Sequence, residues 1–271
     1  MAPQLSSPAS AQIVGTYATG MTAPSDLAWD SSGNLFVSGN GGLVYKVGPG
    51  GSPVTVFASG FNHPFGLEFG ASGDLFVSDR TGIIWKVATN GSKVVFATGL
   101  ADPTWIHFDD AGNLFVAEWS VRNLKRVSPT GVVTMYAPLL GAVSNEVGDF
   151  TILPSGIIEV GVGNDIKRVG IGGSPVTTIA AGLGACYGMR RNGDGSFFVT
   201  RGPSRDIWYV SPSGVGSCYV GGSGCADGPI AIASFFYPDG VRVHDGVLYI
   251  ADHTCRSVRR FNLSEVPMPT A

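Results

Sequence analysis

Charged side chains are scarce in this sequence, and no long apolar run replaces them. Asp, Glu, Lys and Arg make up only 14% of the 271 residues, and the formal net charge is −3. Proteins that bind nucleic acids usually carry a basic excess that neutralises phosphates, so a nucleic-acid partner is not expected. No apolar stretch reaches the roughly 18 residues that a membrane-spanning helix needs, so no membrane span is expected either.

Familiar catalytic and targeting motifs are also missing. The chain contains no G-x-S-x-G, H-E-x-x-H, Walker or dinucleotide-binding motif. Residues 1–10 are polar and rich in Pro and Ser, without the charged and apolar regions of a signal peptide. We expect them to be a disordered or tag-like segment, or the remnant of a trimmed precursor. The sequence therefore carries no direct address, and an extracellular or periplasmic location is the one we favour.

Cysteine is rare, with four residues that all lie in the last third of the chain: Cys186, Cys218, Cys225 and Cys255. No C-x-x-C pair is present, so a zinc site built from thiolates is not expected. Cys218 and Cys225 flank a Gly-rich segment, which predicts a local disulfide and leaves Cys186 and Cys255 for a second bridge. Four free thiols are the alternative.

Glycine, in contrast, is abundant, at 40 residues, and 17 prolines accompany it. This composition, with 44% hydrophobic residues, favours a turn-rich all-β fold over disorder. One pattern recurs, in which two short apolar strands flank a Gly turn: LAWDSSGNLFVS, LEFGASGDLFVS, IHFDDAGNLFVA, FTILPSGIIEVG, MRRNGDGSFFVT and VRVHDGVLYIA. The turn glycines are Gly33, Gly73, Gly112, Gly156, Gly195 and Gly246, spaced by 40, 39, 44, 39 and 51 residues.

Each copy continues with a third strand, such as LVYKV or IIWKV, and most end with a fourth, such as PVTVFASG or KVVFATG. Asn-Gly and Ser-Gly pairs between β-branched runs indicate hairpins, because Gly accepts the positive φ that these turns require. Four antiparallel strands in about 40 residues are typical of a β-propeller blade. The sequence therefore predicts six blades.

The last repeat lacks a fourth strand, while the N-terminus carries a strand without a repeat, residues 12–20, whose ending GTYATG matches TVFASG and VVFATG. We expect this strand to complete the last blade and close the ring, which protects an otherwise exposed sheet edge. The prediction is an all-β, six-bladed propeller of four-stranded antiparallel blades over residues 11–263. Residues 264–271 form a C-terminal tail.

The repeats resemble those of the NHL-repeat propellers over roughly residues 11–263. The resemblance lies in Pro-x-Gly before the first strand, as in His63-Pro64-Phe65-Gly66-Leu67, and in Leu-Tyr-Ile-Ala-Asp at 248–252 of the last repeat. Propellers of this shape include gluconolactonase-like hydrolases, virginiamycin B lyase-like enzymes, peptide-amidating lyases and non-catalytic binding modules. Because one fold hosts many functions, the resemblance is specific for fold and weak for function.

Residues that open the inner strand of each blade are the first candidates for a site: Ser25, Phe65, Thr104, Gly148, Tyr187 and Asp239. Gluconolactonase-like enzymes place metal-binding Glu, Asn and Asp at such positions, and here only Asp239 matches. Asp26 and Asp149 lie one residue later and are possible substitutes. The resemblance thus implies one divalent cation (Ca, Mg, Mn or Zn) held by Asp239, Asp149 and Asp26. Capping of nearby backbone N–H groups by these Asp residues is the alternative.

A second set of positions lies further along the same strands: Ala28, Glu68, His107, Thr151, Arg190 and Arg242. Their neighbours are apolar, so these side chains are expected to point into the channel, where partial desolvation would shift their pKa values. We expect Glu68, Arg190 and Arg242 to bind a ligand. A structural ion pair between Glu68 and either arginine is the alternative.

The ends of the second strands add Glu118 and His253. Resemblance to virginiamycin B lyase-like enzymes implies His and Glu in such loops beside a divalent metal, so Glu118, His107 and His253 are the candidate acid–base groups. His63 is expected at the channel mouth. Trp105, Trp119 and Tyr187 depart from the core pattern near the loops and are expected to stack on a ligand, sugar rings included.

Two functions follow from these candidates. The first is a metal-assisted hydrolase or lyase that acts on a small cyclic ester or lactone-like substrate in the channel. The second is a non-catalytic NHL-type module that binds a protein, peptide or glycan through its loop face. Both place a small molecule, peptide or glycan at the channel mouth.

Overall fold

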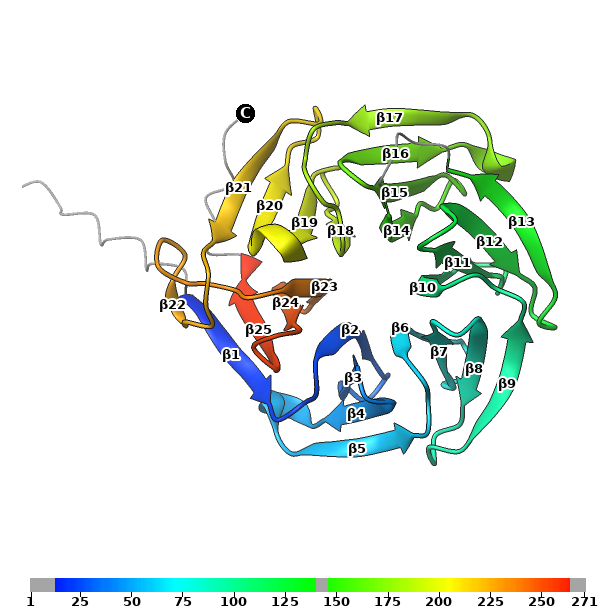
Figure 1. Cartoon of the computed structure of the whole chain (residues 1–271), viewed down its shortest axis with the longest axis horizontal. Coiled ribbons are helices and arrows are strands. Elements are labelled where there is room, and N and C mark those ends of the chain that lie inside the picture. Colours follow the sequence, from blue (N-terminus) through cyan, green and yellow to red (C-terminus); the bar gives the residue numbers. More distant parts are fainter. Residues whose placement is uncertain (1–12, 140–145, 264–271) are drawn as a thin grey trace, which may run out of the picture.

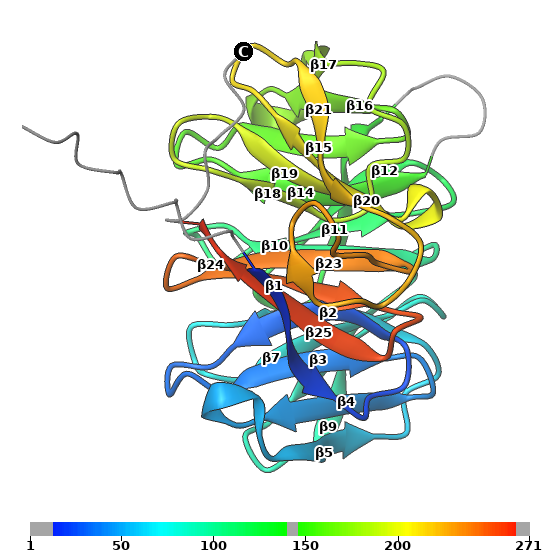
Figure 2. The same cartoon turned by 90° about the vertical axis from the view of Figure 1, so that its left-hand side faces the viewer.

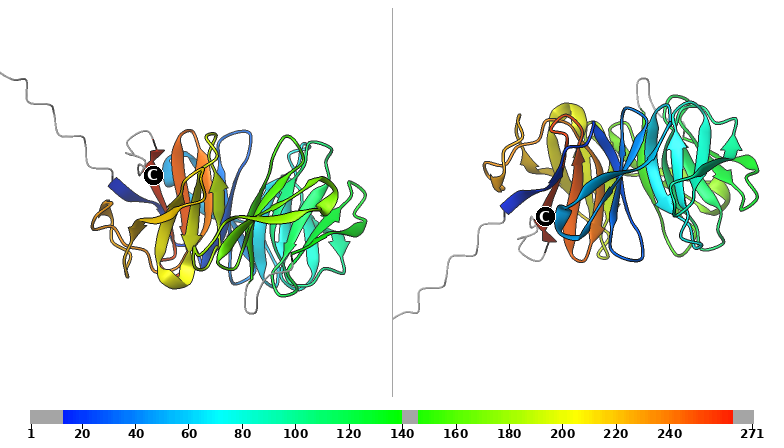
Figure 3. Two further views of the ribbon diagram at one scale, coloured as in Figure 1. Left: turned by 90° about the horizontal axis from the view of Figure 1, so that it is seen from above. Right: turned by 90° about the horizontal axis from the view of Figure 1, so that it is seen from below.

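The strands form a ring of six blades around a central axis (Figure 1). The structure is a computed structural model that describes residues 13–139 and 146–263. The segments predicted for 1–10 and 264–271 lie outside the described residues. Seen from its edge, the ring shows the blades side by side, with their strands crossing its thickness (Figure 3). The predicted all-β, six-bladed propeller is confirmed.

The first three blades each contain four antiparallel strands. Blade 1 consists of β2 (Pro24–Trp29), β3 (Leu35–Gly39), β4 (Leu43–Val47) and β5 (Val54–Ser59). Blade 2 consists of β6 (Pro64–Phe69), β7 (Leu75–Asp79), β8 (Ile83–Val87) and β9 (Lys93–Thr98). Blade 3 consists of β10 (Pro103–Phe108), β11 (Leu114–Glu118), β12 (Asn123–Val127) and β13 (Val133–Pro138).

The last three blades follow the same order from the axis outward. Blade 4 consists of β14 (Val147–Ile152), β15 (Ile158–Val162), β16 (Asp165–Val169) and β17 (Val176–Ala180). Blade 5 consists of β18 (Met189–Arg191), β19 (Phe197–Arg201), β20 (Asp206–Val210) and β21 (Gly216–Gly221). Blade 6 consists of β23 (Pro238–His244), β24 (Val247–Asp252), β25 (Ser257–Asn262), β1 (Ile13–Thr19) and β22 (Gly228–Pro229).

Short 3-10 turns are the only helical elements among the described residues: η1 (Pro49–Gly51), η2 (Ile171–Gly173) and η3 (Gly202–Ser204). Within the described part of the chain, no helix is long and apolar enough to cross a membrane.

The N-terminal strand closes the ring, as the sequence predicts. β1 pairs antiparallel with β25, with Gly15 opposite Arg260 and Thr19 opposite Ser257 (Figure 2). Val14 on β1 is fully buried in the core of blade 6. β22 adds a fifth strand on the outer side of β1, so this edge is covered as well.

Neighbouring blades are held together by aromatic side chains at a repeated position. Phe36 on β3 meets Phe57 of its own outer strand and Phe69 of the next inner strand, both edge-on, at centroid distances of 4.8 and 5.1 Å. Edge-on pairs of this kind stabilise packing beyond the area they bury. The same arrangement recurs one blade later around Phe76.

Blade 4 replaces this aromatic with a charge. Glu159 on β15 is fully buried, and its carboxylate oxygens lie 2.6 Å from Arg168 and 2.8 Å from Arg191. Arg191 lies on the next inner strand, where Phe69 lies beside Phe36, whereas Arg168 lies opposite Glu159 on the third strand, as Lys46 lies opposite Phe36. The pairing of both arginines with Glu159 makes burial of the charge tolerable.

In three blades, a hydroxyl group on the second strand forms a hydrogen bond to the next blade. Ser38 accepts a hydrogen bond from the backbone N of Asp26 and donates to the carbonyl of Phe65, at 2.9 and 2.5 Å. Ser78 and Thr200 make the equivalent contacts in blades 2 and 5. These bonds fix the inner strands and therefore the positions of the channel residues.

The cysteine pairing differs from the prediction. Cys225 and Cys255 form the disulfide, while Cys186 is buried and Cys218 is exposed on β21 as free thiols. The reason is the long connection between β21 and β23, which adds β22 to the blade and folds back against the turn after β24. Sequence proximity of Cys218 and Cys225 gave no information about this fold-back.

Candidate functional site

The mouth of the channel is built by backbone hydrogen bonds between two sets of loops. The N–H of the residue that follows each second strand donates to a carbonyl in the loop before the inner strand. Arg80 bonds to His63 in this way, Trp119 to Asp102, and His253 to Tyr237, at 3.0, 3.1 and 2.9 Å. Each of these backbone bonds brings its two residues together at the mouth.

The acidic residues that end three second strands hold these loops. Asp79 accepts from the N–H groups of Asn62 and His63, and Asp252 accepts from those of Phe236 and Tyr237. Glu118 does the same for Ala101, at 2.8 Å. Its side chain is buried and lies outside the lining of the mouth cavity. Glu118 thus has a structural contact, which its shared position with Asp79 and Asp252 could have indicated, and its acid–base role stays a prediction.

A cavity of about 310 Å³ opens at the mouth. Seven candidates from the sequence line it: Ser25, His63, Phe65, Trp119, Tyr187, Asp239 and His253. Four further residues also line it: Asn40, Arg80, Tyr237 and Thr254. Asn40 and Arg80 follow their second strands as Trp119 and His253 do, so the repeat itself carried the signal for them.

Aromatic rings form a continuous wall of this cavity. The ring centroid of Tyr187 lies 5.1 Å from that of Trp119 and 5.7 Å from that of Tyr237, and Tyr237 lies 5.7 Å from His253. Trp105, which was also expected to stack on a ligand, is fully buried and packs edge-on against Phe65 at 5.0 Å. It offers no surface to a ligand, because the inner strand turns it into the core.

The ionisable groups of the mouth have shifted pKa values. Burial lowers the pKa of both His63 and His253, and nearby Arg80 adds to the effect on His63, so both imidazoles are neutral near pH 7. Burial, followed by the charge of Asp26, raises the pKa of Asp239. Asp239 is only 3% exposed, and its Oδ1 has no hydrogen-bond partner among the described residues.

Deeper in the channel, the candidates form a buried ion network. His107 lies 3.2 Å from Glu68 and 2.8 Å from Asp149, and Arg242 lies 2.5 Å from Asp149 and 2.9 Å from Asp26. Although burial alone would lower it, the pKa of His107 rises to about 9 because Asp149 and Glu68 favour its charged form. His107 is thus a cation near pH 7, which removes it as a base there. Glu68 forms its ion pair with His107, whereas the alternative reading of the sequence had expected Arg190 or Arg242 as the partner.

Arg190 belongs to the same level of the channel and is half-buried. Burial and then the charge of Arg242 lower its pKa, whereas Asp149 and Glu68 act in the opposite direction. Arg190 and Arg242 therefore lie in one electrostatic cluster with the network. Glu68, Arg190 and Arg242, all expected to bind a ligand, lie outside the lining of the mouth cavity.

Two of the three expected metal ligands pair with an arginine. Arg242 already binds both Asp26 and Asp149, and the raised pKa of Asp239 disfavours its anionic form. Across residues 13–139 and 146–263, no group of three or more His, Cys, Asp and Glu side chains is placed to hold a metal ion. A hard divalent cation needs several convergent oxygens, and here the guanidinium of Arg242 lies between two of the expected carboxylates.

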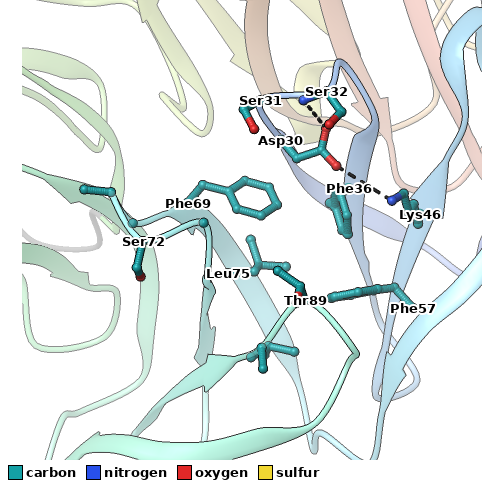
Figure 4. Close-up of a pocket in the computed structure, with 15 residues that line it drawn as sticks. Asp30, Ser31, Ser32, Phe36, Lys46, Phe57, Phe69, Ser72, Leu75 and Thr89 are labelled. Carbon is teal, nitrogen blue, oxygen red and sulfur yellow. Dashed lines mark hydrogen bonds and ion pairs between the residues drawn. The ribbon is translucent and has the colours of Figure 1, made fainter.

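A second cavity, of about 500 Å³, lies between blades 1 and 2 at the opposite ends of their strands. Phe36, Phe57, Phe69 and Leu75 gather around it, with the ion pair of Asp30 and Lys46 at its rim (Figure 4). Its walls include the aromatic side chains whose contacts join the two blades. None of the candidate residues lines it.

Comparison with known proteins shows the fold alone. Neither a protein-family model nor a curated protein sequence matches the chain. An auxiliary nutrient binding protein from Bacteroides thetaiotaomicron is similar in structure, with a TM-score of 0.77 and 14% identity over 93% of this chain and 76% of that one. A catalytically inactive histidine-to-alanine variant of virginiamycin B lyase from Staphylococcus aureus, solved with quinupristin, is also similar. Its TM-score is 0.66, and the two sequences are 16% identical over 89% of this chain and 80% of that one. The structure of a gluconolactonase candidate has a TM-score of 0.71 and 14% identity over 94% of this chain and 93% of that one.

Proposed function

We propose that the chain binds a small organic molecule in the mouth cavity and acts on it as a hydrolase or lyase of a cyclic ester or lactone-like compound. The observation that carries this proposal is the meeting of two neutral imidazoles, His63 and His253, with the buried carboxyl of Asp239 around one cavity. Groups with shifted pKa values that converge on a cavity are typical of acid–base sites.

In a hydrolysis, the imidazole of His253 would accept a proton from water as the water oxygen bonds to the acyl carbon. The bond between that carbon and the leaving oxygen then breaks, and the imidazolium returns its proton to the alkoxide. Ester and water thus become acid and alcohol, with the histidine restored. A neutral imidazole suits this role, because a general base must be unprotonated before it accepts a proton.

A second candidate is non-catalytic binding of a peptide, protein or glycan at the same loop face. Phe236 favours it, because this side chain is 39% exposed and directly precedes Tyr237 of the cavity wall. The aromatic wall suits flat or ring-shaped groups of any of these partners.

The disulfide supports a proposed location. Cys225 and Cys255 are joined in the folded chain. Such bonds persist in oxidising compartments and are rare in the cytosol. An extracellular or periplasmic site of action is the proposal that fits them.

The test is a screen of lactones, esters and cyclic depsipeptides, with product detection by mass spectrometry. His253→Ala is expected to lower turnover about 100-fold or more, as loss of a general base does. His244→Ala is the matched control, since His244 stacks on Trp29 at the far end of β23. Compounds that bind without turnover, and lose binding in Trp119→Ala, would favour the second candidate. A cavity that binds none of them overturns the first candidate.

A further inference from the structure

Arg80 is held rigidly at the mouth by two aromatic rings. It follows β7 directly, and its guanidinium carbon lies 5.9 Å from the ring centroid of Phe65 and 5.7 Å from that of Trp119. All three residues line the mouth cavity. A guanidinium placed over aromatic faces gains cation–π attraction and loses little freedom when it binds a further group.

An ion pair uses two of its three nitrogen positions. Nε donates to Oδ1 of Asp102 at 2.6 Å and Nη2 donates to Oδ2 at 2.8 Å. Nη1 therefore has no hydrogen-bond partner among the described residues. The side chain keeps 28% of its surface exposed, so its remaining donors are within reach of a ligand.

The charge of Arg80 is already balanced. Asp102 forms the two-point pair, and Glu146 lies nearby as the acceptor for the Tyr187 hydroxyl at 3.2 Å. Asp102, Asp239 and Glu146 all act to raise the pKa of Arg80. This part of the cavity thus has a donor without an excess of positive charge. An anionic ligand would meet the nearby carboxylates, whereas a neutral carbonyl oxygen would accept from Nη1 without that repulsion.

We propose that Arg80 is a specificity-determining residue that binds the carbonyl oxygen of a neutral acyl compound through Nη1, and that Asp102 keeps carboxylates and phosphates out. The inference rests on the proposed function, because it assigns the ligand class of the same cavity. The ring of the ligand would lie along Trp119 and Tyr187. Asp102 acts through Arg80 and is the positioning residue of the pair.

The experiment compares three probes that share a benzene ring: the neutral lactam 3,4-dihydroquinolin-2-one, the carboxylate 3-phenylpropionate, and phenyl phosphate. Saturation-transfer NMR titrations give the dissociation constant of each. The lactam resists hydrolysis, so binding is measured apart from turnover. The wild-type chain should prefer the lactam over both anions.

Two variants test the hydrogen-bond donor of Arg80 and the negative charge of Asp102 separately. Arg80→Gln should weaken lactam binding about 10-fold, because a hydrogen bond from a charged donor is lost. Asp102→Asn should instead shift the preference toward the carboxylate by about 10-fold, since Arg80 is no longer balanced. Asp102 has a φ of 54°, and Asn tolerates this left-handed conformation well. Asp74→Asn is the matched control, because Asp74 pairs with Lys86 at 3.0 Å and is 22% exposed, close to the 23% of Asp102.

The outcomes distinguish this inference from the function on which it rests. A lactam preference that Asp102→Asn reverses and Asp74→Asn leaves unchanged supports it. Probes that bind wild type without such a shift, or a wild type that prefers an anion, overturn the role of Arg80 and leave the cavity as the site. If no probe binds the wild-type chain, the inference fails, and the screen of lactones, esters and cyclic depsipeptides tests the proposed function separately.

Discussion

The Nε2 atom of His107 lies 2.8 Å from Oδ1 of Asp149, a carboxylate that is completely buried. Burial would raise the pKa of Asp149, but Arg242 and His107 outweigh it, and the pKa is lowered. Each partner thus favours the charged form of the other. The pair is a structural element of the channel with a titration that can be followed.

Stability should fall as His107 loses its proton. Its pKa of about 9 in the folded chain exceeds the ordinary 6.5, so its stabilising effect is complete below pH 6.5 and is lost as the pH rises through 9. The free energy of unfolding should drop by up to ~3 kcal/mol across this range. His107→Gln should flatten that dependence. Urea unfolding of both proteins at pH 6.5, 8 and 9.5 measures it, and parallel curves would contradict the charged state of His107.

The ring closure makes Val14 important for stability. Val14 is fully buried in blade 6, while its neighbour Ile13 is 61% exposed. Val14→Ala should cost about 2 kcal/mol, through lost burial and a small cavity. The expected fall in melting temperature is about 4–8 °C. Ile13→Ala serves as the control and should change it little. Equal effects of both variants would argue against a packed N-terminal strand.

The repeat allowed the fold to be predicted, because each blade repeats the same local pattern. It also placed Asp26, Asp149 and Arg242 in the channel. It did not show that the arginine lies between the two carboxylates, because β2, β14 and β23 come from different blades and meet only when the ring closes. The backbone contact of Glu118 with Ala101 was missed for a related reason, since residue type alone does not distinguish a backbone cap from an acid–base group.

The disulfide should stabilise both the last blade and the mouth. It joins residues 30 apart, and Cys255 directly follows Thr254 of the cavity lining. Cys225→Ser should cost about 3–4 kcal/mol through the freed loop of the unfolded chain. Cys218→Ser, at an exposed free thiol, is the control. Thermal melts with and without dithiothreitol test this prediction: only wild type and Cys218→Ser should respond to the reductant, and a Cys225→Ser variant that also responds would contradict the pairing.

Arg242 decides whether a divalent cation can bind in the channel. Its guanidinium bridges Asp26 and Asp149, so we expect calcium, magnesium, manganese and zinc to leave the melting temperature of the wild-type chain unchanged. Arg242→Gln removes the arginine from two buried carboxylates, leaving Asp26 without a cationic partner and Asp149 with His107 alone, which should cost about 3–5 kcal/mol. A cation that binds them would restore part of this loss in proportion to its concentration. Elemental analysis and thermal shifts of both proteins measure the effect. A stoichiometric metal in the wild-type chain would instead establish the cation that the sequence predicts, and the ion pairs of Arg242 would then have to open to admit it.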